Sequence, residues 1–596
     1  VGGPLPPGGV ETFTLVVHID SSTPNNTVLT NTATVPSLAM RRGDFGELLN
    51  PANPYFGRAV ILTNPQTNLP FPGNVIPANL LSPNGVALLN AYPEPTAGFQ
   101  LGTANAIFSS DNPQDQRKDN IRFDYRLNAA NQIVFRYSKY NWVSIDAFRP
   151  AAGFPYARTD WDRPNSTQTL TWTSTLKNNL INEATYTHSL DQVFINVFTG
   201  TDLYKRSRTG INYPYIFPAN KEIPDKIPTI SIANFTEIDG GPYPSSSQGP
   251  IHTFSDAMTL VKGRHTFKTG VVVEYSGEDD FDQINVQAIP GSTNNQNGRF
   301  EFLDNRAGGT GLAVANAAMG LFSNYAEIGQ RAFTPWRALG TDLFAQDSWR
   351  PASNLTIEGG VRWVFWPPWH SQTNNIANFE PQFYDRANAA IVDPVTGRIV
   401  GGPRYNGIVL PGTGFAGDGN SLVVASDPAV LALFRDQPEG FSQTHLNAIE
   451  PRAGLAYSMN EKTVLRASVG VFHNRVTLND SSLLGGNPPF QPQVSVSNGV
   501  VDNPGAGGAA NLPFSMTAQD VVFNLPTAYM WASGVQREIP FGFTVDVTYV
   551  GRLGRYLQRE RNINQLQPGT LQANPGVNIA ALRPYLGYGA IRLTEN

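Results

Sequence analysis

The sequence predicts an all-β protein: a transmembrane antiparallel β-barrel with long extracellular loops, preceded by a short β-sandwich-like fragment. Three observations favour this fold. Apolar and polar residues alternate strictly over stretches of about ten residues, as strands between lipid and water require. Short turns alternate along the chain with long polar connections, which is typical of the two rims of such a barrel. No run reaches the roughly 18 apolar residues of a membrane-spanning helix, because the best candidate, 312–322, is interrupted by Asn316.

The composition agrees with a β-rich membrane protein and excludes several functions. Charged residues make up 15% of the 596 residues, below the roughly 25% of soluble globular proteins, whereas glycine (55) and aromatic residues (11%) are plentiful. The net charge of −5 provides no basic surface, so we expect no nucleic-acid partner. The chain has no cysteine, which excludes disulfides, thiolate metal sites and cysteine nucleophiles.

The first predicted element is a short fragment at 1–37. Its opening run VGGPLPP is linker-like, and 12–20 and 27–35 each have the pattern of a short strand. Because Val1 follows no initiator methionine or signal peptide, we expect the sequence to begin inside a larger protein. The remainder, 38–596, is the predicted barrel domain.

Six hairpins follow within the barrel domain, and each joins two alternating strands through a short turn. In the first hairpin, Ile121, Phe123 and Tyr125 point to one side, while Arg122 and Asp124 point to the other. The predicted hairpins lie at 120–137, 170–188, 262–275, 350–365, 453–471 and 529–551. Together they supply about a dozen strands.

The alternation separates a face suited to lipid from a face suited to water. An arginine on the lipid face at the bilayer midplane costs about 2–4 kcal/mol. The arginines of these strands that avoid the apolar face are Arg122, Arg126, Arg136, Arg362 and Arg466. Soluble β-sandwiches and propellers also alternate, but a propeller needs a regular period of roughly 40–50 residues, which these uneven connections do not supply.

The long connections are the predicted external loops, at 192–251, 277–336 and 366–450, and they far exceed the usual loop length. Aromatic residues gather where strands enter these connections. The two groups are Trp363, Trp366 and Trp369, and Tyr137, Tyr140 and Trp142. They indicate the aromatic girdle of a membrane interface, and carbohydrate stacking is the alternative.

Several segments resemble one known family. The run FAQDSW at 344–349, followed by NLTIEGGVR at 354–362, resembles a hairpin of the TonB-dependent outer-membrane receptors. Further segments resemble the Oar-like branch of these receptors: RRGDF at 41–45, FPGNVIP at 71–77, GRHTFKTG at 263–270, PRAGLAY at 451–457 and TVLRA at 463–467. The resemblance extends from about Ala39 to the end of the chain and follows the family order.

This resemblance implies a barrel of roughly 22 strands, closed by an N-terminal plug that an inner-membrane energy-transducing complex pulls open. The chain departs from that pattern at both ends. We expect no plug or energy-coupling segment before Ala39, since 12–20 and 27–35 resemble the end of an immunoglobulin-like secreted repeat. The run RLTEN at 592–596 lacks the aromatic residue that ends a closing strand, so we expect a C-terminally incomplete barrel.

The sequence offers little support for catalysis. It contains no HExxH pair, no GxSxG elbow and no P-loop, and the formal dinucleotide match at 412–417 lies in a loop without a βαβ unit. We therefore expect no enzymatic activity and no cofactor. Four carboxylates that could hold a cation, Glu278, Asp279, Asp280 and Asp282, begin a predicted loop, but the spacing of an EF-hand is absent and a solvated charge run is the preferred explanation.

Two functions remain open. The resemblance implies transport of a small molecule, an oligosaccharide or a protein across the bacterial outer membrane, with lipid and the TonB complex as partners. The alternative is a surface-exposed adhesion or structural barrel without active transport, which the sandwich-like beginning favours. In either case the long loops are the predicted binding region.

Overall fold

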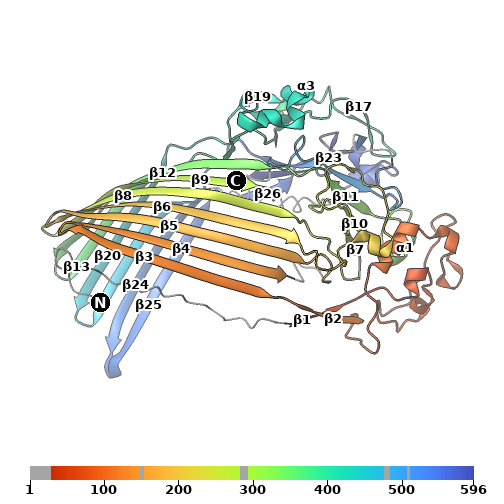
Figure 1. The fold of residues 1–596 in the computed structure, drawn as a ribbon, viewed down its shortest axis with the longest axis horizontal. Helices are drawn as coiled ribbons and strands as arrows, with labels where there is room; N and C mark the ends of the chain where they lie inside the picture. The colour runs from red at the N-terminus through yellow and green to blue at the C-terminus, as the bar shows by residue number, and fades with distance from the viewer. Residues whose placement is uncertain (1–27, 147–153, 282–292, 476–483, 507–510) are drawn as a thin grey trace.

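A computed structural model describes residues 28–146, 154–281, 293–475, 484–506 and 511–596. It has two parts, a large curved sheet of long strands and a globular assembly at one end of that sheet (Figure 1). No helix in the described residues is long and apolar enough to span a membrane.

The large sheet consists of twelve long antiparallel strands, with the short strand β14 (His370–Ser371) paired to one of them. The twelve strands are β3 (Gln114–Asn128), β4 (Asn131–Asp146), β5 (Thr159–Lys177), β6 (Leu180–Val197), β8 (Ser245–Lys262), β9 (His265–Asp280), β12 (Thr334–Ala352), β13 (Leu355–Phe365), β20 (Ala448–Asn460), β21 (Thr463–His473), β24 (Thr527–Ile539) and β25 (Phe543–Arg555). Each pairs with its neighbours in chain order, and β3 and β25 form the edges within the described residues.

The six predicted hairpins are confirmed, and their short turns lie at the end of the sheet away from the globular assembly (Figure 1). The strands are longer than predicted at their other ends. As a result, the predicted connections 192–251, 277–336 and 366–450 shorten to 198–244, 281–333 and 366–447. Beyond the apolar band the strands continue through polar residues, which still form the backbone hydrogen bonds of the sheet. Because these residues do not alternate between apolar and polar, the sequence pattern does not reveal this part of the strands.

Strand register confirms the predicted separation of the two faces. Arg122 pairs directly with Arg136, and Phe123 pairs with Phe135, so the charged and aromatic rows lie on opposite sides. We call the side that carries the arginines the inner face and the other side the outer face. Large apolar side chains are exposed along the outer face, among them Tyr125 (50%), Trp172 (51%), Val469 (56%) and Val547 (68%). Such an apolar surface suits contact with lipid.

The predicted aromatic girdle is only partly right. Trp363 and Tyr137 lie on the outer face, as predicted. Trp142 instead belongs to the inner face, where its ring centroid lies 5.9 Å from that of the buried Trp161. Trp366 also turns inward, since its indole N–H donates to Asp342 at 2.9 Å. Trp142 has the parity of Arg136 in β4, and Trp366 follows β13 with the parity of Arg362, so the alternation itself places both rings on the inner face.

The globular assembly is built from the long connections together with the N-terminal residues, and we call it the cap. It comprises 28–105, 154–158, 198–244, 293–333, 366–447, 484–506, 511–526 and 556–596. Its main sheet has seven strands in the order β26 (Arg559–Asn562), β27 (Tyr588–Glu595), β23 (Phe514–Gln519), β22 (Gln493–Ser497), β11 (Asn324–Ile328), β10 (Arg299–Phe302) and β7 (Thr229–Ile232).

Smaller elements complete the cap. They are the strands β15 (Asn378–Phe379), β16 (Ile391–Val392), β17 (Ile399–Gly401), β18 (Ile408–Pro411) and β19 (Phe434–Gln437), and the helices α1 (Pro83–Asn90), α2 (Ala313–Ala318), α3 (Pro428–Leu431) and α5 (Thr570–Ala573). One hydrophobic core joins all of these segments, from Ala33 near the start of the described chain to Leu593 near its end.

The N-terminal segment is part of this core. Strand β1 (Val28–Ala33), which overlaps the predicted strand at 27–35, pairs with β2 (Ala106–Asp111) just before the large sheet begins. Val35 is fully buried in the cap core. The predicted strand at 12–20 lies outside the described residues. The division of the chain at 37/38 therefore stays a prediction.

The two faces predict different tolerance for charge. Leu170 is exposed on the outer face, and its neighbour Thr171 lies on the inner face of the same strand. We expect Leu170→Arg to destabilise the membrane-embedded protein by about 2–4 kcal/mol, because the charge enters lipid. Thr171→Arg is the matched control and should be far milder. Urea unfolding of each variant in lipid vesicles measures the difference, and equal losses would contradict the assignment of the faces.

Candidate functional site

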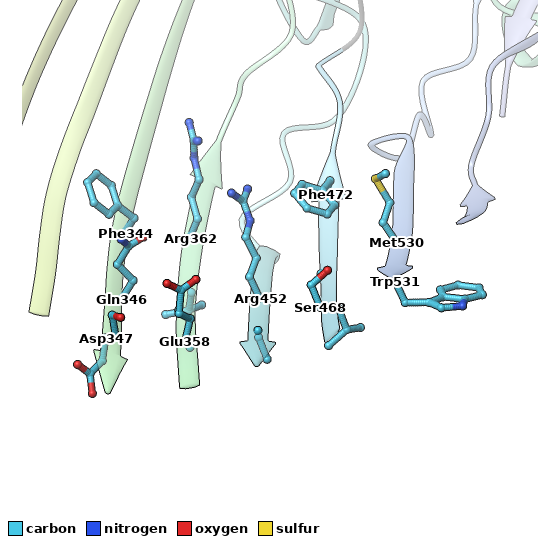
Figure 2. Close-up of a pocket in the computed structure, with 18 of the residues that line it drawn as sticks. Phe344, Gln346, Asp347, Glu358, Arg362, Arg452, Ser468, Phe472, Met530 and Trp531 are labelled. Atoms are coloured by element: carbon cyan, nitrogen blue, oxygen red, sulfur yellow. The ribbon is translucent and has the colours of Figure 1, made fainter. Parts of the chain in front are cut away.

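A groove on the inner face is the most developed cavity of the large sheet. It has a volume of about 610 Å³ and crosses β12, β13, β20, β21 and β24 to reach Val550 of β25. Figure 2 shows Arg362, Arg452, Phe472 and Met530 extending from successive strands along this surface. A second cavity of about 400 Å³ adjoins it and includes Arg466, Gln536 and Asp546. The two cavities share wall residues, so they form one continuous depression.

Strand alternation alone places the polar side chains in this groove. In β13 the residues Glu358, Gly360 and Arg362 share the inner face, and each is directly opposite an inner-face residue of β20. Glycine makes room for larger neighbours. A Cβ at Gly270 would lie 2.7 Å from the ring of Phe344, its direct cross-strand partner, so the ring lies flat over the missing side chain.

The two groove arginines are held by acids outside the groove lining. Arg362 pairs with Asp342, which also accepts the hydrogen bond from Trp366. Arg452 donates to Glu450 at 2.8 Å, and its guanidinium lies 4.5 Å from the centre of the Phe472 ring. Both acids are nearly buried, with 9% and 4% of their side chains exposed. Each arginine is therefore neutralised and fixed in place.

Glu358 differs from these paired groups. It lies in the wall that both cavities share, and its side chain is exposed. Among the described residues no hydrogen bond or ion pair engages its carboxylate. Because no ion pair with the described residues occupies this carboxylate, it is available to a positively charged group that enters the groove.

The inner face of β5 and β6 has a different character. Threonine and serine side chains form three cross-strand hydroxyl pairs: Thr167 with Ser189 at 3.2 Å, Thr169 with Thr187 at 3.3 Å, and Thr171 with Thr185 at 3.2 Å. This stretch is uncharged and rich in donors and acceptors. The inner surface thus combines a charged wall with a hydroxyl wall.

The cap is held by a buried ion pair between two of the predicted loops. Lys221 donates to Glu327 at 2.7 Å, and 1% and 0% of the two side chains are exposed. Glu327 also accepts the backbone N–H groups of Ile216 and Phe217 at 2.9 Å and the hydroxyl of Tyr325 at 2.6 Å. Burial lowers the pKa of Lys221, and the nearby carboxylate opposes that effect.

Polar residues extend this network through the cap interior. The run 293–297 is almost fully buried, with at most 4% of any residue exposed. Its side chains donate to backbone carbonyls of other segments, such as Asn295 to Ile227 at 3.3 Å and Gln296 to Gly329 at 3.1 Å. These amides connect loops that contribute few regular strands, so the cap is specified by polar contacts as well as by its apolar core.

The predicted acidic cluster is divided by the strand that carries it. β9 extends to Asp280, and alternation places Glu278 and Asp280 on the inner face and Asp279 on the outer face. Asp279 pairs with Arg337 at 2.8 Å. Asp282 lies outside the described residues. No group of three or more candidate ligands that could hold a metal occurs in the described chain, and the cation site stays a prediction.

Sequence reasoning placed Glu358 on the polar face but did not single it out. One feature of the sequence could have marked Glu358. Its nearest neighbours on the same face of the strand are Thr356 and Gly360, so no basic side chain of its own strand lies directly beside it. The predicted binding loops do come together, since all of them contribute to the cap core.

Comparison with protein families identifies the class of fold. The family described as outer membrane beta barrel domain matches residues 1–596. Among solved structures, the outer membrane transporter YddB from Escherichia coli is 10% identical with a TM-score of 0.42, and the match covers 82% of this chain and 43% of that protein. No curated protein sequence matches this chain.

Two further structures are similar at the same level. The ferric enterobactin receptor PfeA from Pseudomonas aeruginosa, as a mutant, is 12% identical with a TM-score of 0.41 and coverages of 82% and 48%. The alcaligin receptor FauA from Bordetella pertussis is 10% identical with a TM-score of 0.33 and coverages of 79% and 48%. The chain thus spans less than half the length of these proteins.

The buried pair in the cap can be tested directly. Glu327→Gln removes the charge that compensates Lys221 while keeping a side chain of the same size, and we expect it to destabilise the cap by about 3–5 kcal/mol. Limited proteolysis of the cap segments measures the loss. Glu538→Gln removes an exposed partner of Lys462 near a short turn and serves as the control. Equal protease resistance of both variants would show that the pair does not hold the cap.

Proposed function

Because this chain belongs to the family of outer membrane beta barrel domains, we propose that it takes part in transport across the bacterial outer membrane. The inner face of the large sheet forms a wall of the passage, and the cap is the surface that meets the ligand. The protein is located in the outer membrane. The observation that carries the proposal is the continuous depression on the inner face, which combines fixed arginines with the unpaired Glu358.

Energy coupling is the finer part of this proposal. The segments FAQDSW at 344–349 and NLTIEGGVR at 354–362 resemble TonB-dependent receptors, and these receptors are driven by an inner-membrane complex. We propose a TonB-type complex as the partner, and small molecules, oligosaccharides or proteins as the candidate cargo.

A surface adhesion or structural role is the second candidate. The cap favours it, because it has an extensive core of its own and presents exposed apolar side chains such as Val395 (75%) and Val423 (87%). Exposed apolar residues on a folded domain can anchor a macromolecular partner. The two candidates differ in one respect: only transport requires the inner face of the sheet.

A change of charge at Glu358 tests the passage. We expect free lysine to enter vesicles that contain the full chain about five times faster than free glutamate does. This ratio corresponds to the interaction energy of about 1 kcal/mol between two unit charges near 4 Å apart in water. Glu358→Lys should reverse this order because it inverts the local potential. Radiolabelled uptake into the vesicles measures both rates.

Glu461→Lys is the matched control, since Glu461 is exposed in the short turn between β20 and β21 and lies outside the depression. It should leave the preference for lysine unchanged. If vesicles with the protein and vesicles without it took up each solute at the same rate, this result would reject the passage. Adhesion would be favoured if cells that carry cap variants no longer bound to surfaces, whereas cells that carry Glu358→Lys still did.

A further inference from the structure

A row of directly paired residues crosses the outer face, about midway along β3, β5 and β6 and nearer the cap end of β9 and β12. It runs through Ile121, Tyr137, Gln168, His188, His252, Tyr275 and Leu339, each paired in register with the next. Aromatic and aliphatic residues are expected at this level of a membrane barrel. Two neighbouring imidazoles in the middle of the row are not explained by contact with lipid.

The two histidines are close neighbours. His188 and His252 are direct cross-strand partners on β6 and β8, and their ring centroids lie 4.8 Å apart. Two imidazoles bound side by side to one metal, with metal–nitrogen distances of about 2.0–2.1 Å, bring their ring centres to within about 5 Å of each other. Sharing one metal ion therefore needs no large movement of the strands.

The second nitrogen of each ring is already fixed. His188 Nδ1 lies 2.6 Å from Gln168 Oε1, and His252 Nδ1 lies 2.8 Å from the hydroxyl of Tyr186. An amide oxygen only accepts, so His188 Nδ1 carries the hydrogen and its Nε2 keeps the lone pair. Hydrogen bonds of this type orient metal-binding histidines and make the other nitrogen a better ligand.

The row lies close to a boundary on the outer face. One step toward the short turns, the paired residues are Leu170, Tyr186, Phe254 and Val273. One step toward the cap, Leu190 pairs with Pro250, and two steps toward the cap the residues are Gln192, Gln248 and Asp279. The outer face therefore becomes polar two steps beyond the histidines, which are themselves partly exposed.

We propose that His188 and His252 form a binding site for a divalent transition-metal cation on the outer face. The chemistry favours borderline metals that imidazole prefers, with Cu²⁺ bound more tightly than Ni²⁺ or Zn²⁺. Gln168 and Tyr186 orient the two rings, and water supplies the remaining ligands. This site is separate from the groove and does not depend on transport.

Titration of the full chain in detergent with CuCl₂ tests the proposal. We expect one Cu²⁺ per chain, and affinity lowered by more than about tenfold in His188→Gln and in His252→Gln, since loss of an orienting partner alone costs 10–100-fold. His370→Gln is the control, because His370 lies in β14 at the cap, away from another histidine ring. It should leave the affinity unchanged.

Electron paramagnetic resonance of the wild-type chain with one equivalent of Cu²⁺ gives a readout that needs no variant. Hyperfine splitting from two nitrogen ligands is expected. A spectrum with one or no nitrogen ligand would overturn the shared site even if a variant failed to fold. Equal affinity of the wild type and the double variant His188→Gln/His252→Gln, with both folded by circular dichroism, would overturn it as well.

Discussion

The in-register pairing of neighbouring strands is the constraint on which the rest of the molecule depends. Backbone N–H and C=O groups within a membrane must be satisfied by the chain itself, and an antiparallel ladder satisfies them between strands. Once the ladder is fixed, side chains alternate between the outer and the inner face, apart from register shifts beside four of the short turns. The groove, the hydroxyl wall and the histidine row are all consequences of one register, because a slip by one residue would exchange their faces.

The cap is not held together by regular strand pairing alone. Its strands are short and come from distant segments, and three of its pairings, β7 with β10, β18 with β19 and β23 with β27, are parallel. Buried amides and the Lys221–Glu327 pair fix these segments to one another where regular ladders do not. The molecule thus combines a sheet specified by periodicity with a cap specified by individual polar contacts.

Periodicity explains what could be predicted from the sequence. All six hairpins, the polar position of Arg362 and Arg466, and the face of Glu358 follow from a period of two. The cap could not be predicted in this way, since every residue of β23 is buried and leaves no alternation. The inward position of Trp142 and Trp366 follows from the same period, since they share the parity of Arg136 and Arg362. The isolation of Glu358, by contrast, depends on which residues the neighbouring strands present.

The span of the cap core has a consequence for biogenesis. Each hairpin of the large sheet closes a contact between consecutive segments, so it can assemble as the chain is delivered, beginning from the N-terminal strands. The cap core requires Ala33 and Leu593 at once. Its central sheet cannot be complete until 588–595 have arrived, long after its earliest segments. During that interval the first cap segments expose apolar surface, which makes the incomplete cap prone to aggregation.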